Sequence, residues 1–227
     1  MRQDIFVTGT DTGIGKTWIS CGLLDAFNVK GLNTLAMKPV ASGCELRDGK
    51  RVNEDAELLM QHASVSIPYS DVNPYAFNDP VAPHLAAQQE NTPICLDAIK
   101  NLYLKNREKS DVIVMEGVGG WLVPISESKT VSDIVRECNL ATVLVVGIRL
   151  GCINHALLTV DSLRNSGAHL KGWVANLIDQ HCNNVEGNIQ TLKDRIDAPL
   201  MGSVPFLKNK NVQTIADHLD ANALLKL

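Results

Sequence analysis

The stretch GTDTGIGKT, residues 9–17, follows directly after the short apolar run IFVTG at 5–9. A glycine-rich turn that ends in Gly-Lys-Thr and opens a helix is typical of loops that bind phosphate through backbone N–H groups and the lysine. The common spacing has four residues between the two glycines, but here five residues separate Gly9 from Gly15, and Thr10 stands where the pattern has glycine. The strand–loop–helix context favours a phosphate loop over a glycine-rich turn with an incidental lysine.

Short apolar runs recur along the chain, and they are nearly continuous in Val, Ile and Leu rather than alternating. Such runs are typical of strands that are buried on both faces, as in a parallel sheet covered by helices. Stretches of helical length separate them, and two of these, 16–31 and 153–167, end at a glycine, which is common at helix C-termini. The pattern predicts one α/β domain over 1–227, with a doubly wound, mainly parallel sheet and helices on both faces. The clearest expected strands are 5–9, 34–40, 111–117, 142–148, 172–178 and 200–205.

Length, composition and charge agree with such a domain. The chain has 227 residues, of which 45% are hydrophobic and 20% charged, and its net charge is −4. This charge argues against nucleic acid or an anionic membrane as the main partner, and no basic run changes that conclusion. No signal peptide or membrane span is visible, so we expect a soluble, cytoplasmic protein. The six cysteines are scattered without a C-x-x-C pair, which favours reduced thiols over a zinc or disulfide framework.

In sheets of this kind, ligands bind outside the carboxyl ends of the strands. Lys38 ends the second expected strand and would face the same pocket as Lys16, which indicates strongly anionic chemistry, such as a triphosphate plus a second anion. The alternative for Lys38 is a side chain that reaches solvent. Asn176 also stands at a strand end, where it would either read adenine or begin a turn. The irregular, polar and Pro-containing segment 41–92 is expected to lie over this edge.

Acidic residues supply candidate metal ligands. Glu116 is at the tip of an apolar strand, where such folds place a carboxylate that faces a metal, and the alternative is a solvated glutamate that caps a turn. Gly117 and Gly119 follow it and would let the backbone approach a ligand closely. Asp55, in NEDAELL, is either a metal ligand or a helix N-cap.

Together these segments resemble the dethiobiotin synthetase family of biotin biosynthesis, in order and over essentially the whole chain. The segments are FVTGTDTGIGKT (6–17), KPVASG (38–43), EGVGGW (116–121), VVGIRLGCINHALLT (145–159), GWVAN (172–176) and PFL (205–207). The phosphate loop of that family has one extra residue, which accounts for the spacing between Gly9 and Gly15.

The resemblance implies an ATP- and Mg²⁺-dependent ligase that makes dethiobiotin, ADP and phosphate from 7,8-diaminononanoate and CO2. The reaction passes through a carbamate and a carbamic-phosphoric anhydride before the ring closes. A carbamate is anionic, so a second cation beside the phosphate loop suits this chemistry. The closing step is intramolecular, and positioning alone contributes strongly to such reactions.

The resemblance also implies roles for individual residues. Lys38 and Lys16 would be catalytic, and Thr12 and Ser42 would contact the diamine or its carbamate. Mg²⁺ would be held by Thr17, Asp55 and Glu116. The ATP site would consist of Gly13, Ile14, Gly15, Lys16, Thr17, Trp18, Asp55, Glu116, Gly117, Val118, Gly119, Asn176, Pro205, Phe206 and Leu207.

Members of the family are homodimers, and the resemblance implies a substrate site shared across the interface. In it, the turn that matches Gly151, Cys152 and Ile153 comes from the partner subunit and receives the tail carboxylate of the substrate. The start of a helix suits an anion, and the alternative is an ordinary strand–helix connection.

The sequence departs from the family at two places. Some members have an acidic residue soon after the PFL segment, whereas KNKNV at 208–212 has none, so the ribose contact and any role for Val212 stay open. Gly13 stands where some members have glutamate, so no side chain can contact the substrate there.

Other classes of protein remain alternatives. A switch ATPase of the partition or assembly-regulating type has a signature lysine five positions before the loop lysine, and here that residue is Asp11. A different ATP-dependent ligase on the same scaffold is disfavoured by KPVASG and GCINH. A relative that binds ATP without turnover is not supported, because every charged position that the chemistry needs is filled.

Overall fold

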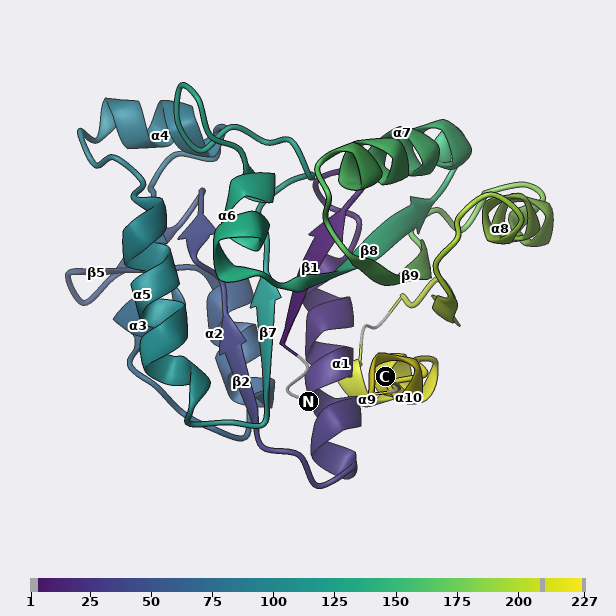
Figure 1. Ribbon diagram of the computed structural model, residues 1–227, viewed down its shortest axis with the longest axis horizontal. Helices are drawn as coiled ribbons and strands as arrows, with labels where there is room; N and C mark the ends of the chain where they lie inside the picture. The colour runs from purple at the N-terminus through teal and green to yellow at the C-terminus, as the bar shows by residue number, and fades with distance from the viewer. Residues whose placement is uncertain (1–3, 209–210, 226–227) are drawn as a thin grey trace.

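A computed structural model describes residues 4–208 and 211–225, and its centre is a six-stranded sheet with the order β10-β9-β8-β1-β7-β2 (Figure 1). All five strand pairs are parallel. The strands are β1 (Ile5–Gly9), β2 (Thr34–Met37), β7 (Val112–Glu116), β8 (Ala141–Ile148), β9 (Leu170–Leu177) and β10 (Leu200–Val204). The six predicted strands and the parallel sheet are confirmed, although β2 ends earlier than the predicted 34–40.

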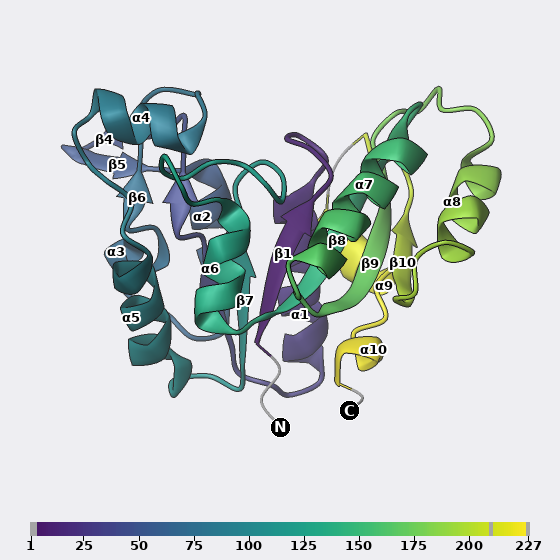
Figure 2. The same ribbon diagram turned by 45° about the horizontal axis from the view of Figure 1, so that its top comes forward.

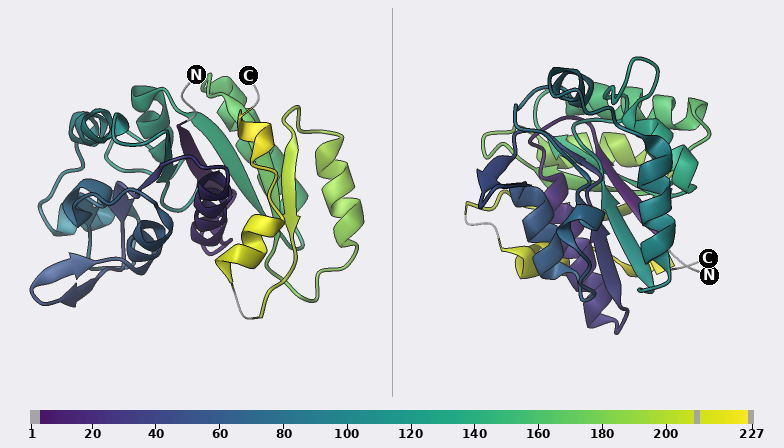
Figure 3. Two further views of the ribbon diagram at one scale, coloured as in Figure 1. Left: turned by 90° about the horizontal axis from the view of Figure 1, so that it is seen from below. Right: turned by 90° about the vertical axis from the view of Figure 1, so that its left-hand side faces the viewer.

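Helices cover both faces of this sheet, as Figures 1 and 2 show. One face carries α5 (Leu96–Arg107), α6 (Val131–Cys138), α7 (Cys152–Asn165) and α8 (Val185–Lys193). The opposite face carries α1 (Lys16–Val29), α2 (Glu54–His62), α9 (Val212–Asp217) and α10 (Asn222–Leu225). Helix α9, near the C-terminal end, packs along α1, so segments from the two ends of the chain lie side by side (Figure 3).

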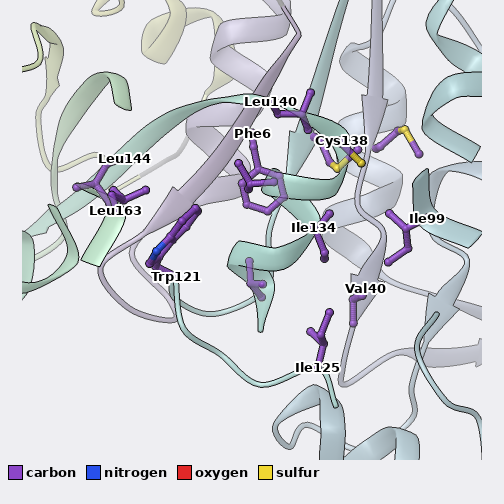
Figure 4. Close-up of a cluster of buried hydrophobic side chains, with 14 of the residues drawn as sticks. Phe6, Val40, Ile99, Trp121, Ile125, Ile134, Cys138, Leu140, Leu144 and Leu163 are labelled. Carbon is purple, nitrogen blue, oxygen red and sulfur yellow. The ribbon is translucent and has the colours of Figure 1, made fainter. Parts of the chain in front are cut away.

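Each strand contributes side chains to both layers. Ile5 and Val7 of β1 pack toward α1, whereas Phe6 points to the opposite layer. Figure 4 shows Phe6 in a cluster with Trp121 and Ile134. Alternate residues of a strand face opposite sides of the sheet, so a strand covered on both sides is apolar throughout. This explains the continuous apolar runs in the sequence.

The two predicted helix ends at glycine are confirmed. Gly31 and Gly167 have φ angles of 78° and 73°, in the left-handed region. At the first end, the Gly31 N–H donates to the Asn28 carbonyl and the Leu32 N–H to the Phe27 carbonyl. This is the hydrogen-bond pattern that satisfies the last carbonyls of a helix.

The segment 41–92 contains several short elements that the apolar pattern of the sequence did not predict. They are β3 (Val40–Ala41), β4 (Glu45–Arg47), β5 (Lys50–Val52), α3 (Tyr69–Val72), β6 (Tyr75–Ala76) and α4 (Pro83–Gln89). β3 pairs with β6, and β4 forms an antiparallel hairpin with β5. In Figure 2 this hairpin and α4 lie close together, above α3 and α5.

Strand register brings the candidate site residues to one edge of the sheet. Met37 of β2 pairs with Met115 of β7, so the next residues, Lys38 and Glu116, come side by side. The arrows of β1, β2 and β7 point to this edge in Figure 1. Within 4–208 and 211–225, no helix has both the length and the apolar character needed to cross a membrane.

We expect the Gly202→Ala substitution in β10 to destabilise the fold. A Cβ at this position would overlap the backbone carbonyl oxygen of His218, where Gly202 forms an antiparallel bridge with Leu219. Overpacking against backbone lowers the free energy of unfolding by about 1–3 kcal/mol, which urea denaturation would measure. Ser203→Ala, at the exposed next position, is the control and should change the free energy of unfolding by less than about 0.5 kcal/mol. Equal stabilities of the two variants would contradict this packing argument.

Candidate active site

The phosphate loop connects the end of β1 at Gly9 to the start of α1 at Lys16. Gly15 caps the helix in a left-handed conformation, with φ 88°, and a Cβ there would overlap Nδ2 of Asn176. The N-cap residue Gly15 makes no side-chain hydrogen bond to this helix, and the start of a helix suits an anion. The local backbone therefore has the properties of a phosphate-binding loop.

A backbone carbonyl of the loop contacts the loop lysine. Lys16 is buried, and its Nζ donates to the backbone oxygen of Asp11 at 2.8 Å. Burial lowers the pKa of Lys16 to about 8, although the negative charge of Glu116 opposes this effect. The lysine is thus held against the loop that it would help to close around a phosphate.

A buried charge cluster lies beside the loop. Lys38 Nζ is 2.5 Å from Glu116 Oε1 and 3.2 Å from Asp55 Oδ2. The Thr17 hydroxyl donates to the same Glu116 oxygen at 2.9 Å. The side chains of Lys38 and Glu116 are only 4% and 0% exposed, so a solvent-facing lysine and a solvated glutamate are both excluded.

Opposite charges favour the ionised forms of Lys38 and Asp55. Burial disfavours the charged form of Lys38, but Glu116 and Asp55 outweigh it and hold the pKa of Lys38 above its ordinary value. For Asp55, burial is outweighed chiefly by the positive charge of Lys38, so the pKa of Asp55 lies below its ordinary value. The result is a fixed cation between two carboxylates.

Helix α2 places Asp55 in this cluster. Asn53 caps the helix, because its side chain accepts a hydrogen bond from the Ala56 N–H at 3.2 Å. Asp55 lies in the first turn after that cap, and its carboxylate reaches Lys38. The alternative interpretation of Asp55 as the N-cap is therefore wrong.

Thr17, Asp55 and Glu116 form an oxygen-only set, which suits Mg²⁺. Glu116 Oε2 is buried without a hydrogen-bond partner, so one oxygen of the set is left over. In the described part of the chain, no group of three or more His, Cys, Asp and Glu residues is arranged to hold a metal, so the set depends on the Thr17 hydroxyl. These residues fit the predicted magnesium site.

Two cavities extend from the loop. The first has a volume of about 590 Å³ and contains the charge cluster, and the second has about 320 Å³. They share Gly13, Gly15 and Trp18. Predicted site residues that line only the first are Thr12, Lys16, Thr17, Lys38, Ser42, Asp55, Glu116, Val118 and Gly119. Predicted site residues that line only the second are Asn176, Pro205, Phe206 and Leu207.

Asn176 connects the second cavity to the phosphate loop. Its Nδ2 donates to the backbone oxygen of Ile14 at 2.6 Å. The amide also has its oxygen and a second N–H, which is the donor–acceptor pair that an adenine edge requires. Ile14 and Gly117 line neither cavity. Ile14 is a buried residue of the loop, and Gly117 packs against Phe6.

The turn of Gly151, Cys152 and Ile153 is not brought to either cavity of the same chain. Gly151 caps α7 with a φ of 90°, and Cys152 is buried. The preceding Leu150 is 97% exposed. The turn therefore lines neither cavity of its own chain, and the residue before it is open to solvent.

Several residues that line the first cavity were not predicted as site residues: Ala41, Asn53, Pro80, Val81, Ala82, Pro83 and Val123. All but Val123 come from 41–92, so the expectation that this segment covers the active edge is confirmed. The PVAP sequence at 80–83 could have indicated that a helix begins here, because proline is common in the first turn of a helix.

Of the segment 208–212, the structure describes Lys208, Asn211 and Val212. Lys208 lines the second cavity, and Val212 begins α9 and is buried. The ribose contact that stays open in this segment also concerns Asn209 and Lys210, which lie outside the described residues.

Comparisons with known proteins bear on the family of this chain. A family model described as an AAA domain matches residues 3–214. The ATP-dependent dethiobiotin synthetase BioD of Cellvibrio japonicus is 42% identical over 224 residues, which cover 99% of this chain and 98% of that protein. The protein of the same name from Pseudomonas paraeruginosa is 44% identical over 223 residues, with 96% of each chain covered.

Among solved structures, the MinD cell division protein of Aquifex aeolicus is similar, with a TM-score of 0.58. The alignment covers 98% of this chain and 96% of that one at 15% identity, so this likeness concerns the fold alone. The predicted family is instead confirmed by the curated relatives. With more than 40% identity to them over nearly its whole length, the chain belongs to the family of ATP-dependent dethiobiotin synthetases.

Proposed function

We propose that this protein is a ligase that forms dethiobiotin, ADP and phosphate from 7,8-diaminononanoate, CO2 and ATP within a single domain. The observation that carries the proposal is the buried Lys38 between Glu116 and Asp55, on the wall of a cavity next to a phosphate loop. A phosphate loop alone would serve any nucleotide hydrolase. A second fixed cation beside it suits transfer of the phosphate to an anionic acceptor.

The two cavities divide the substrates between them. The smaller one, with Asn176 and the apolar residues Pro205 and Leu207, would hold the adenosine. The phosphates would then lie along the loop toward Lys16 and the larger cavity, since Gly13 and Gly15 border both. This direction points the terminal phosphate at Lys38.

Lys38 would act on the carbamate. An amine of the diamine bonds to the carbon of CO2 and loses a proton, which gives a carbamate anion. Lys38 would hold this anion in line with the terminal phosphate and stabilise the charge that develops as a carbamate oxygen attacks phosphorus and ADP leaves. Ser42 Oγ, which is buried without a partner at this cavity, would donate a hydrogen bond to the same group.

Ring closure needs little more than positioning. The neighbouring amine attacks the carbonyl carbon of the anhydride, phosphate leaves and the amine loses its proton, so that a cyclic urea forms. Both reacting atoms belong to one molecule, and such steps are strongly accelerated by orientation. The apolar residues Val81, Val118 and Val123 on the cavity wall would hold the alkyl part of the substrate in place.

Magnesium would be held by Thr17, Asp55 and Glu116. When bound, it supplies positive charge that neutralises the oxygens of the transferring phosphate. The unpartnered Glu116 Oε2 supports this role. In the absence of the ion, the Lys38 ammonium keeps Glu116 and Asp55 from repelling each other.

The active unit would be a homodimer whose sites are shared. The turn at Gly151–Ile153 lies outside both cavities of its own chain, and two leucines beside it, Leu150 and Leu158, are 97% and 62% exposed. Exposed leucines before α7 and on it suit an apolar interface between subunits. The N-terminus of α7 would then receive the tail carboxylate of the substrate bound to the partner.

The proposal is tested by the release of ADP and phosphate from Mg·ATP, with the diamine and bicarbonate present together and each omitted in turn. Turnover that needs both, with dethiobiotin formed in step with ADP, is the expected result. ATP hydrolysis that does not depend on the diamine would contradict the ligase and support a switch ATPase.

The Lys38→Gln variant should separate catalysis from nucleotide binding. Loss of a cation that acts on the transition state reduces kcat by about 10²–10³-fold, whereas ADP affinity measured by calorimetry should stay within about threefold because Lys38 would not contact ADP. Lys100→Gln, which removes an exposed lysine that pairs with Glu137, is the control and should leave both unchanged. A loss of ADP affinity as large as the loss of kcat would contradict the role of Lys38.

The Leu158→Asp variant should weaken the dimer. A carboxylate at an apolar contact raises the dissociation constant, which sedimentation would measure, and the KM for the diamine should rise more than the KM for ATP. Leu104→Asp on α5, at an exposed leucine (47%) away from α7, is the matched control. A monomeric variant that keeps the original KM for the diamine would refute the shared site.

A further inference from the structure

One residue of the phosphate loop, Asp11, is held in place by a residue far away in the sequence. Asp11 accepts three hydrogen bonds. Its backbone oxygen accepts one from Lys16 Nζ at 2.8 Å, and its Oδ1 accepts one from the Thr12 N–H at 2.7 Å. Its Oδ2 accepts the third from Arg149 Nη2 at 2.5 Å. Two of these contacts come from within the loop. The third comes from a residue 138 positions later.

Arg149 is itself well anchored. It directly follows the last residue of strand β8. Strand β8 pairs with β1, and Gly9 lies opposite Val145 in this pairing. The Thr10 N–H continues the pairing, because it donates to the Val145 carbonyl. On its other side, the Arg149 carbonyl accepts from the Cys152 N–H at 3.0 Å and so closes the turn before α7. The backbone at Arg149 is thus fixed relative to the start of the phosphate loop.

The charge of Asp11 is poorly suited to its position. A carboxylate on a loop that binds phosphates repels them, unless a cation neutralises it. Arg149 supplies that cation, and the side chains of the pair are 41% and 44% exposed. Neither residue lines the two cavities, so neither is in a position to touch the nucleotide there.

We propose that Arg149 is a positioning residue for nucleotide binding, which acts through Asp11. Its guanidinium holds the Asp11 carboxylate away from the phosphate site and cancels its charge. With the side chain fixed, the Asp11 carbonyl stays directed at Lys16, and the loop keeps the conformation that its additional residue requires. The inference rests on the proposed function only in that the loop binds the phosphates of a nucleotide.

The test is calorimetric binding of Mg·ADP to the full-length protein, without diamine or bicarbonate. Arg149→Met keeps the length of the side chain but removes its charge, so ADP should bind about fivefold to tenfold more weakly, which exceeds the usual effect of a half-exposed ion pair alone. Arg164→Met is the matched control, because Arg164 forms an exposed ion pair with Asp197 away from the loop. It should leave ADP affinity unchanged.

Rescue distinguishes positioning from a general structural role. Asp11→Asn in the Arg149→Met background removes the unpaired charge and keeps an oxygen for the Thr12 N–H, so ADP affinity should return to within about twofold of the original. Arg149→Lys keeps a positive charge and should lose less affinity than Arg149→Met. Thermal unfolding of all variants shows whether they are folded.

The inference is overturned if Arg149→Met binds Mg·ADP as tightly as the original protein, or if Asp11→Asn fails to restore its affinity. Failure of the proposed function would look different. In that case no dethiobiotin would form, while the loss of ADP affinity and its rescue would still be observed, because this measurement does not depend on the diamine.

Discussion

The contact between Lys38 and Glu116 is the interaction on which the site depends. Each charge would be very unfavourable in a buried position without the other, and together they form a short, nearly solvent-free ion pair at the edge of the sheet. Buried ion pairs rarely stabilise a fold more than apolar residues of the same size would. Their retention at the wall of a cavity therefore indicates a functional constraint. Asp55 and Thr17 complete the cluster, and each is placed by the first turn of the helix that contains it.

Much of this arrangement was predictable from the sequence, for identifiable reasons. A parallel sheet buried on both faces has strands that are apolar throughout, so β1, β7 and β8 are visible as runs of Val, Ile and Leu. Ligand sites at the carboxyl ends of such strands follow from the fold, which directs attention to Lys38 and Glu116. The glycines of the loop and the lysine that follows them are local features of the sequence.

Other parts were not predictable, because they depend on contacts between distant segments. The role of Asp55 was open until α2 placed it beside Lys38 and Asn53 proved to be the helix cap. The short elements within 41–92 have too few residues to produce a periodic pattern. The contact between Asp11 and Arg149 joins residues that are 138 positions apart, and only the pairing of β1 with β8 brings them together.

The strand order has a consequence for how the protein is made. In the described chain, β1 pairs with β7 and β8, and β2 pairs with β7, so the two strands nearest the N-terminus obtain their sheet partners only from Val112 onward. A ribosome that has synthesised the first hundred residues has released the phosphate loop and α1 without the strands that hold them. Until translation passes β8, these apolar segments have unpaired edges, a state in which nascent chains are prone to aggregate and are bound by chaperones. The nucleotide site, encoded first, is thus completed late.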